Sequence, residues 1–379
     1  MRFDMNLSET AFLLIKEGRK DIELRVNDHK RQKIQVSDLI FFHSLENEYD
    51  VIKCQVKAIH HFNDFKQLYE NLPLDRCGYE DIASASYKDM YEYYSEEKIR
   101  EYGVIGIEIE KTDDLYLVDG HMHLEYGPLS VEYVKEFADE AIRKGLDEID
   151  ILDHTHRFKE FEGCYQHLKQ YDQQAEWLKQ PTKFCNTLDD YYELIEKVKK
   201  MDFPIKIKFG LEVCYTSNTE DLLRKILKDV KLDFLTGAIH SVNSILYDMS
   251  FSKDLLWDRY DKNDIYKMYY DEALSCARSS LFDRFAHPDQ IKMFNIYPDY
   301  DLTETFNNLS QELNNQNMYA ENNTGCHYRY GHEDIGISDQ LLKIFKNNNV
   351  KLICASDAHK PAHVGSFILE ATKRNRGIF

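Results

Sequence analysis

The chain has 379 residues, 43% of them hydrophobic, so it is long enough for two domains with sizeable cores. It has no apolar run of the roughly 20 residues that a membrane span needs and no signal-like N-terminus, and its eight cysteines are scattered, so we expect a cytoplasmic protein. The formal net charge of −19 disfavours nonspecific binding of nucleic acid over the whole surface.

The first part of the chain predicts a small α+β domain. It opens with a segment that predicts a helix, and strands are expected at residues 23–26, 38–45 and 49–62. The tyrosine-rich stretch 87–102 predicts another helix, and residues 103–112 predict a closing strand. A new strand that runs into a histidine cluster begins directly afterwards. We therefore place a boundary near Thr112, which gives domains of residues 1–112 and 113–379.

The second part of the chain alternates strands with amphipathic helices. Its expected strands are residues 115–121, 147–154, 205–213, 233–240, 282–287, 318–324 and 350–359. Amphipathic stretches such as residues 130–145 lie between them. Repeated strand–helix units imply a parallel sheet, because parallel neighbours need a crossover connection. Seven such strands over about 260 residues predict an α/β domain with a closed or nearly closed (β/α) barrel.

Histidines and carboxylates stand at the ends of these strands. The side chains concerned are His121, His123, Asp153, His154, Glu212, His240, His287, Asp357 and His359. The carboxyl ends of the strands meet at one rim of a parallel barrel, so these residues are expected to meet in space. Imidazole and carboxylate together suit zinc, iron or manganese, and buried charge is costly without a partner or a metal. We therefore expect a metal centre rather than a structural cluster, with Glu212 bridging two metals.

The motifs HMH, LDH, GLE, AIH, AHPD and SDAH occur in an order that resembles the polymerase and histidinol phosphatase (PHP) family over residues 113–379. The resemblance implies a seven-stranded barrel with two or three divalent ions, of zinc, manganese or iron. By match of motif, the first metal would be held by His121, His123, Glu212 and Asp357. The second would be held by Glu212, His240 and His287. His154 and His359 would contribute to a third, and Glu212 and Asp357 would be the catalytic carboxylates.

The chain departs from the family pattern at Leu129, where the family supplies a further histidine to the third metal. Glu125 or Asp153 is a candidate to complete that site. Alternatively, a cation such as Arg157 replaces the missing positive charge.

Phosphate recognition needs forked or point cations. Arg157 and Arg329 are expected to bind the phosphate, and Arg329 falls where the resembling phosphatases carry an arginine. Lys360 is expected to be a solvated loop cation. Three further histidines could be outer partners or leaving-group acids, although at least two are expected to be ordinary loop residues: His156, His327 and His332.

Residues 3–112 resemble the ASCH family, a PUA-like barrel associated with RNA. The signature is Gly18-Arg19-Lys20 followed by Glu23 and Arg25. The resemblance implies a binding module for RNA or a nucleotide, and a solvated lattice of salt bridges is the alternative. Lys20 also matches the lysine of ASCH amidohydrolases, but the surrounding motif does not carry that activity over.

Three functions follow from these expectations. The first is a phosphomonoesterase of the histidinol-phosphatase type, active in histidine biosynthesis, in which a metal-bridging hydroxide attacks a small phosphate ester. The second is a nuclease or nucleotide phosphoesterase that the ASCH domain directs to RNA, which the acidic surface disfavours. The third is a non-enzymatic sensor of nucleic acid or nucleotides with a degenerate barrel, which the retained set of metal ligands disfavours.

Overall fold

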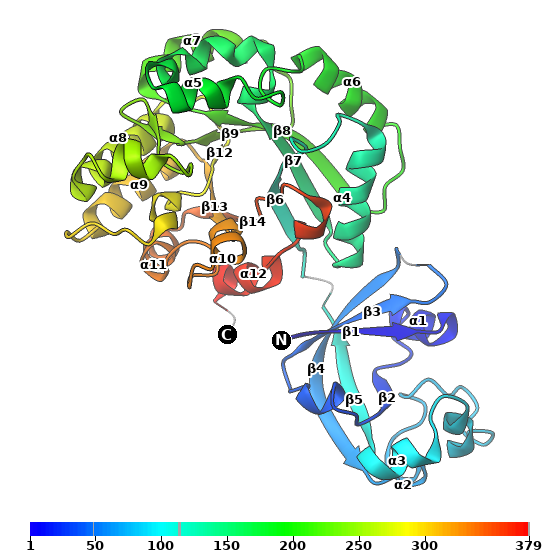
Figure 1. Cartoon of the computed structure of the whole chain (residues 1–379). Helices are drawn as coiled ribbons and strands as arrows, with labels where there is room; N and C mark the ends of the chain where they lie inside the picture. Colours follow the sequence, from blue (N-terminus) through cyan, green and yellow to red (C-terminus); the bar gives the residue numbers. More distant parts are fainter. Residues whose placement is uncertain (48, 113–114, 378–379) are drawn as a thin grey trace. The chain divides into compact units, whose positions relative to one another are not determined.

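The computed structural model describes residues 1–47, 49–112 and 115–377 (Figure 1). The chain divides into two compact units, Met1–Tyr116 and Leu117–Phe379. The expected boundary between residues 112 and 113 adjoins residues 113–114, which lie outside the described residues. Within the described chain, no helix is both long enough and apolar enough to cross a bilayer.

The first unit is built on a five-stranded sheet in the order β1-β3-β4-β5-β2. Its strands are β1 Arg2–Leu7, β2 Ile22–Val26, β3 Leu39–Ser44, β4 Val51–Phe62 and β5 Val104–Lys111. Strands β1 and β3 are parallel, and the other neighbours are antiparallel. The helices are α1 Glu9–Lys16, α2 Phe65–Asn71 and α3 Glu96–Tyr102. The α+β class expected for this unit is confirmed.

The expected helical opening is wrong, because the chain begins with strand β1 and helix α1 follows it. Phe3, Met5 and Leu7 alternate with more exposed polar residues, which is the period of a strand with one buried face. These three side chains pack into the core on one side of the sheet together with Phe12 and Ile15 of α1.

The second unit contains a seven-stranded parallel sheet in the order β14-β13-β12-β9-β8-β7-β6. Its strands are β6 Val118–Met122, β7 Glu148–His154, β8 Lys206–Cys214, β9 Phe234–Ala238, β12 Arg284–Phe285, β13 Tyr319–Asn323 and β14 Lys351–Ala355. A parallel bridge between Met122 and Ala358 joins the two edges, so the predicted (β/α) barrel is confirmed.

Helices form a ring outside this barrel (Figure 1). The α-helices of this unit are α4 Val131–Arg143, α5 Asp172–Leu178, α6 Leu188–Val198, α7 Glu220–Leu227, α8 Lys262–Arg278, α9 Thr303–Asn315, α10 Gly325–Tyr330, α11 Asp339–Asn347 and α12 Ile368–Arg376. Since the helices cover one face of the strands and the barrel interior buries the other, a strand such as β7 is almost wholly buried. The polar side chains at the carboxyl ends of the strands therefore lie at the rim of the barrel, next to a buried interior.

Candidate metal centre

Glu212, near the end of β8, lies at the centre of the cluster and is 1% exposed. Its Oε1 is 3.0 Å from His240 Nε2 and 2.9 Å from His287 Nε2. Its Oε2 is 2.6 Å from His154 Nδ1, 3.5 Å from His121 Nε2 and 3.4 Å from His123 Nε2. The two oxygens of one carboxylate thus face two separate groups of imidazoles.

Asp357 and His359 come to this cluster from the loop after β14. Asp357 Oδ1 is 3.3 Å from His123 Nε2 and 3.5 Å from His359 Nδ1. The loop is tied to β6 by Asp119, whose carboxylate accepts hydrogen bonds from the Ser356 and Gly365 amides at 2.8 and 2.7 Å. All eight side chains expected as metal ligands therefore lie together at one rim, while their roles as ligands stay predictions.

The backbone is strained at two of these positions. His287 has φ +28° and Asp357 has φ +57°, values in or near the left-handed region that residues with a Cβ rarely adopt. Such conformations cost of order 1–3 kcal/mol and persist where the surrounding structure requires them, commonly at functional sites. The strain is consistent with a backbone arranged to aim these two side chains at the cluster.

Two carboxylates outside the expected set hold the imidazoles in position. Glu321 of β13 accepts from His121 Nδ1 at 2.8 Å, and Asp248 accepts from His240 Nδ1 at 2.9 Å. A proton on Nδ1 leaves the lone pair of Nε2 facing the cluster, as in metal-bound histidines with an outer carboxylate. Sequence reasoning missed both residues. For Glu321 a signal existed, namely a glutamate within a strand of a buried sheet, whereas the loop residue Asp248 carried none.

Glu321→Gln is expected to weaken metal binding or lower kcat by about 10- to 100-fold, the usual cost of losing an outer partner of a ligand. A glutamine side chain is uncharged, so it accepts the hydrogen bond from His121 Nδ1 more weakly than the carboxylate does. The orientation of His121 is then less fixed, and its Nε2 is less basic. Metal affinity measured by competition with a coloured chelator, together with kcat, tests this. The exposed Glu304→Gln on α9 is the control, and an effect no larger than that of the control would show that Glu321 has only a packing role.

The donor atoms fit a cation. Glu212 Oε2 accepts no hydrogen bond among the described residues, although three imidazole nitrogens lie within 3.5 Å. The Nε2 atoms of His121 and His123 are only 2.8 Å apart. Nitrogen and oxygen donors this close together must share protons or a cation, and a divalent ion can take the place of those protons. Sets such as His121, His123 and Asp357 offer donor atoms within 4.8 Å of one another.

Electrostatics keep the carboxylates ionised. Burial alone would raise the pKa of Glu212, but the imidazoles of His154 and His121 outweigh it and hold the pKa well below its usual range. Asp357 behaves alike, since Arg329 overcomes burial and lowers its pKa. Burial, with the charge of His154 and His359, lowers the pKa of His123 well below normal, which favours the neutral form that binds metals.

Of the two arginines expected to bind phosphate, only Arg329 lines the pocket at this centre. Its NH1 is 3.1 Å from His359 Nδ1, and its NH2 is paired with Asp357. The guanidinium of Arg157 is instead buried among protein acceptors, namely Asp153 Oδ2 at 2.8 Å, Asn186 Oδ1 at 3.0 Å and Gly127 O at 2.9 Å. That arrangement suits a residue that supports the loop containing Gly127, so phosphate binding by Arg157 stays a prediction.

The pocket has a volume of about 260 Å³ and contains most of the predicted cluster. His156 lines it, whereas His327 and His332 do not. Glu125, His154 and His156 offer a further set of donor atoms within 4.8 Å of one another. Glu125 and Asp153 are the two candidates to complete a third metal site, and Glu125 lies beside the potential metal donors His154 and His156. Asp153 pairs with Arg157, and its Oδ1 is 3.9 Å from His123 Nδ1.

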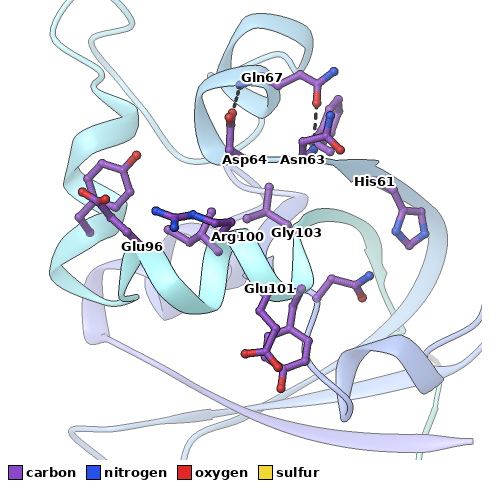
Figure 2. Close-up of a pocket in the computed structure, with 14 residues that line it drawn as sticks. His61, Asn63, Asp64, Gln67, Glu96, Arg100, Glu101 and Gly103 are labelled. Atoms are coloured by element: carbon purple, nitrogen blue, oxygen red, sulfur yellow. Dashed lines mark hydrogen bonds between the residues drawn. The ribbon is translucent and has the colours of Figure 1, made fainter.

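Three of the signature residues of the first unit, Lys20, Glu23 and Arg25, form an ion cluster with little exposure to solvent. Glu23 is 2% exposed, with Lys20 Nζ at 3.1 Å and an Arg25 nitrogen at 3.0 Å. A separate open pocket of about 760 Å³ in this unit is lined by neither Lys20, Glu23 nor Arg25. Figure 2 shows the wall of this pocket. Asp64 Oδ1 accepts a hydrogen bond from the backbone N–H of Gln67, and Gln67 Oε1 accepts one from the backbone N–H of Asn63.

Comparisons with known proteins divide the chain in the same way. A family model described as PHP domain matches residues 119–325, and one described as ASCH domain matches residues 5–113. A probable histidinol-phosphatase of Deinococcus radiodurans is 23% identical over 266 residues, which is 69% of this chain and 94% of that protein. The histidinol-phosphatase of Bacillus subtilis is 25% identical over 267 residues, covering 65% of this chain and 95% of the relative.

A solved structure shares the barrel fold. It is the histidinol phosphate phosphatase of Lactococcus lactis, complexed with zinc, L-histidinol and phosphate. The TM-score is 0.51 at 19% identity, and the match covers 69% of this chain and 93% of the other.

Proposed function

Because the chain belongs to the PHP family, we propose that its barrel is a metal-dependent phosphomonoesterase that acts on small phosphate esters. The observation that carries the proposal is that the two carboxylate oxygens of Glu212 face different imidazoles. Oε1 faces His240 and His287, whereas Oε2 faces a second group that includes His154. A carboxylate between two groups of imidazole nitrogens suits a site for two divalent ions.

In this proposal His121, His123, Glu212 and Asp357 hold one ion, and Glu212, His240 and His287 hold the other. Bound divalent ions supply Lewis-acid charge for the phosphoryl oxygens and lower the pKa of a water molecule towards neutrality. Asp357 also pairs with Arg329, which fixes that guanidinium beside His359 for contact with a nonbridging phosphate oxygen. Glu321 and Asp248 keep the imidazoles oriented.

The substrate that we propose is L-histidinol phosphate or a compound of similar size. The relatives at 23% and 25% identity are named for this activity. A pocket of about 260 Å³ is small for an enclosed ligand site, which favours a compact monoester over a polymer. Trp177, Tyr126 and Tyr330 line the pocket and provide aromatic surface for the part of the substrate beyond the phosphate.

The second candidate is a nucleotide phosphoesterase, and the first unit supports it. Besides the match to an ASCH domain, this unit has buried polar atoms without a hydrogen-bond partner among the described residues, including Arg25 Nε and Arg31 Nε. Such atoms are suited to a base edge or a phosphate. The net charge of −19 still disfavours long nucleic acids.

The full chain, loaded with manganese or zinc, should be assayed for phosphate release from L-histidinol phosphate, other small monoesters and nucleoside monophosphates, and for cleavage of single-stranded RNA. We expect the highest kcat/KM on a small monoester, with L-histidinol phosphate first. Cleavage of RNA without release of phosphate from any monoester would overturn the proposal in favour of a nuclease.

A further inference from the structure

Lys183 is a buried cation in the wall of the same pocket. It lies in the loop between α5 and α6, and its side chain is 6% exposed. Among the described residues that line the pocket, one is a lysine, Lys183, and one is an arginine, Arg329. They come from segments almost 150 residues apart in the sequence. Lys183 carries no signal in the sequence, because one lysine in a polar loop is ordinarily solvated.

The surroundings of Lys183 leave its ammonium group incompletely satisfied. The Nζ atom is 4.4 Å from the centre of the Trp177 ring and 3.3 Å from His156 Nε2. Its carboxylate partner is Glu125, whose Oε2 is 3.8 Å away, within ion-pair range but too far for a hydrogen bond. An ammonium has three donors, and the described residues accept only through one imidazole. A buried cation with unused donors needs an acceptor, and the pocket beside it can admit one.

A continuous row of contacts connects the two cations of the pocket. Lys183 contacts Glu125, Glu125 Oε1 lies 3.5 Å from His359 Nε2, and His359 Nδ1 lies 3.1 Å from Arg329. Lys183 therefore belongs to the same wall as the predicted metal ligand His359. An anion bound between these side chains would meet donors from both ends of the row.

Lys183 also bears on the third metal. Two sets of donor atoms could hold a further ion, namely His123, His154 and His359, and Glu125, His154 and His156. At the second set, the Lys183 ammonium already lies 3.3 Å from His156 Nε2 and 3.8 Å from Glu125. A divalent ion among these donors would face a positive charge only a few ångströms away in a poorly solvated site, which opposes its binding. The same ammonium offers positive charge to a phosphate in the place where such an ion would do so.

We propose that Lys183 is a second phosphate-binding cation of this site and that its ammonium takes the place of a third metal ion beside Glu125 and His156. The inference rests on the proposed phosphatase function. It assigns the phosphoryl group of the substrate to the space between Lys183 and Arg329. It also assigns two metal ions, rather than three, to each chain.

The test compares Lys183→Met with the wild-type chain, with Lys183→Arg as the charge-retaining variant. Lys179→Met, an exposed lysine four residues earlier that pairs with Glu176, is the matched control. Titration calorimetry with inorganic phosphate on metal-loaded protein, metal content by elemental analysis, and KM and kcat are measured. Loss of a charged hydrogen bond should weaken phosphate binding by about 10- to 100-fold. KM should rise in Lys183→Met, Lys183→Arg should recover part of the loss, and the control should not change.

The metal content separates the outcomes. Two ions per chain in the wild type, with weaker phosphate binding in Lys183→Met, supports the proposal, and a third ion gained by the variant supports it further. Three ions in the wild type, or unchanged phosphate affinity in a folded variant with an unchanged melting temperature, overturns it. If the wild type hydrolyses no monoester, the proposed function fails instead, and the phosphate titration still decides the role of Lys183.

Discussion

Glu212→Gln is expected to lower kcat on the best phosphomonoester by more than about 100-fold, which exceeds the usual loss for an outer partner of a ligand. The side chain faces five imidazoles with its two oxygens, so the amide removes charge from both predicted metal positions at once. The amide group also directs two hydrogens at nitrogens that must offer lone pairs to the metals.

Metal content should fall together with kcat in this variant, while the circular dichroism spectrum of the barrel stays native. The matched control is Glu140→Gln, another buried glutamate of the same unit, which lies on α4 and pairs with Lys144 away from the cluster. Near-normal turnover and metal content in Glu212→Gln would show that this carboxylate does not bridge two metals. Equal losses in both variants would point to general destabilisation.

Removal of metal is expected to abolish phosphatase activity and to lower the melting temperature. Ions that bind only the folded state stabilise it by mass action, and the cluster without them must bury converging donors at a cost. Elemental analysis of protein purified without chelator should give about two ions per chain. Activity and melting temperature should both return when Zn²⁺, Mn²⁺ or Fe²⁺ is added to the chelated protein. Fewer than one ion per chain, with no activity regained, would contradict a metal centre.

Loading of the metal-free protein should release protons. Burial alone would lower the pKa of His121 and of His240, but Glu212 acts on both, with Glu321 beside His121 and Asp248 beside His240, and raises each pKa well above the ordinary value. A raised pKa favours the protonated form of both imidazoles, and a metal must displace those protons. The apparent metal affinity should therefore fall as the pH is lowered. Proton release on titration with Zn²⁺ in weak buffer measures this directly, and the absence of release would contradict metal binding by protonated imidazoles of His121 and His240.

The order of elements was largely accessible from local patterns. The seven barrel strands were expected from apolar runs separated by amphipathic helices, and the structure contains all seven. Strand β1 was missed, because six residues with three alternating apolar side chains directly before a helix resemble the start of that helix. A short strand is stabilised by pairing with its neighbour in the sheet. The neighbour of β1 is β3, which lies more than 30 residues further along the chain.

The sequence by itself determined which side chains gather at the rim, because a parallel barrel brings its strand ends together whatever the loops do. Thus His121, Glu212 and Asp357 could be grouped before any contact was known. The tertiary structure alone decided which partners these groups have. Glu321 meets His121 across 200 residues of chain, Arg157 turns towards Asp153 rather than into the pocket, and the ammonium of Lys183 lies beside His156. Contacts of this kind depend on loop paths and on distances of a few ångströms between remote segments, which no local periodicity records.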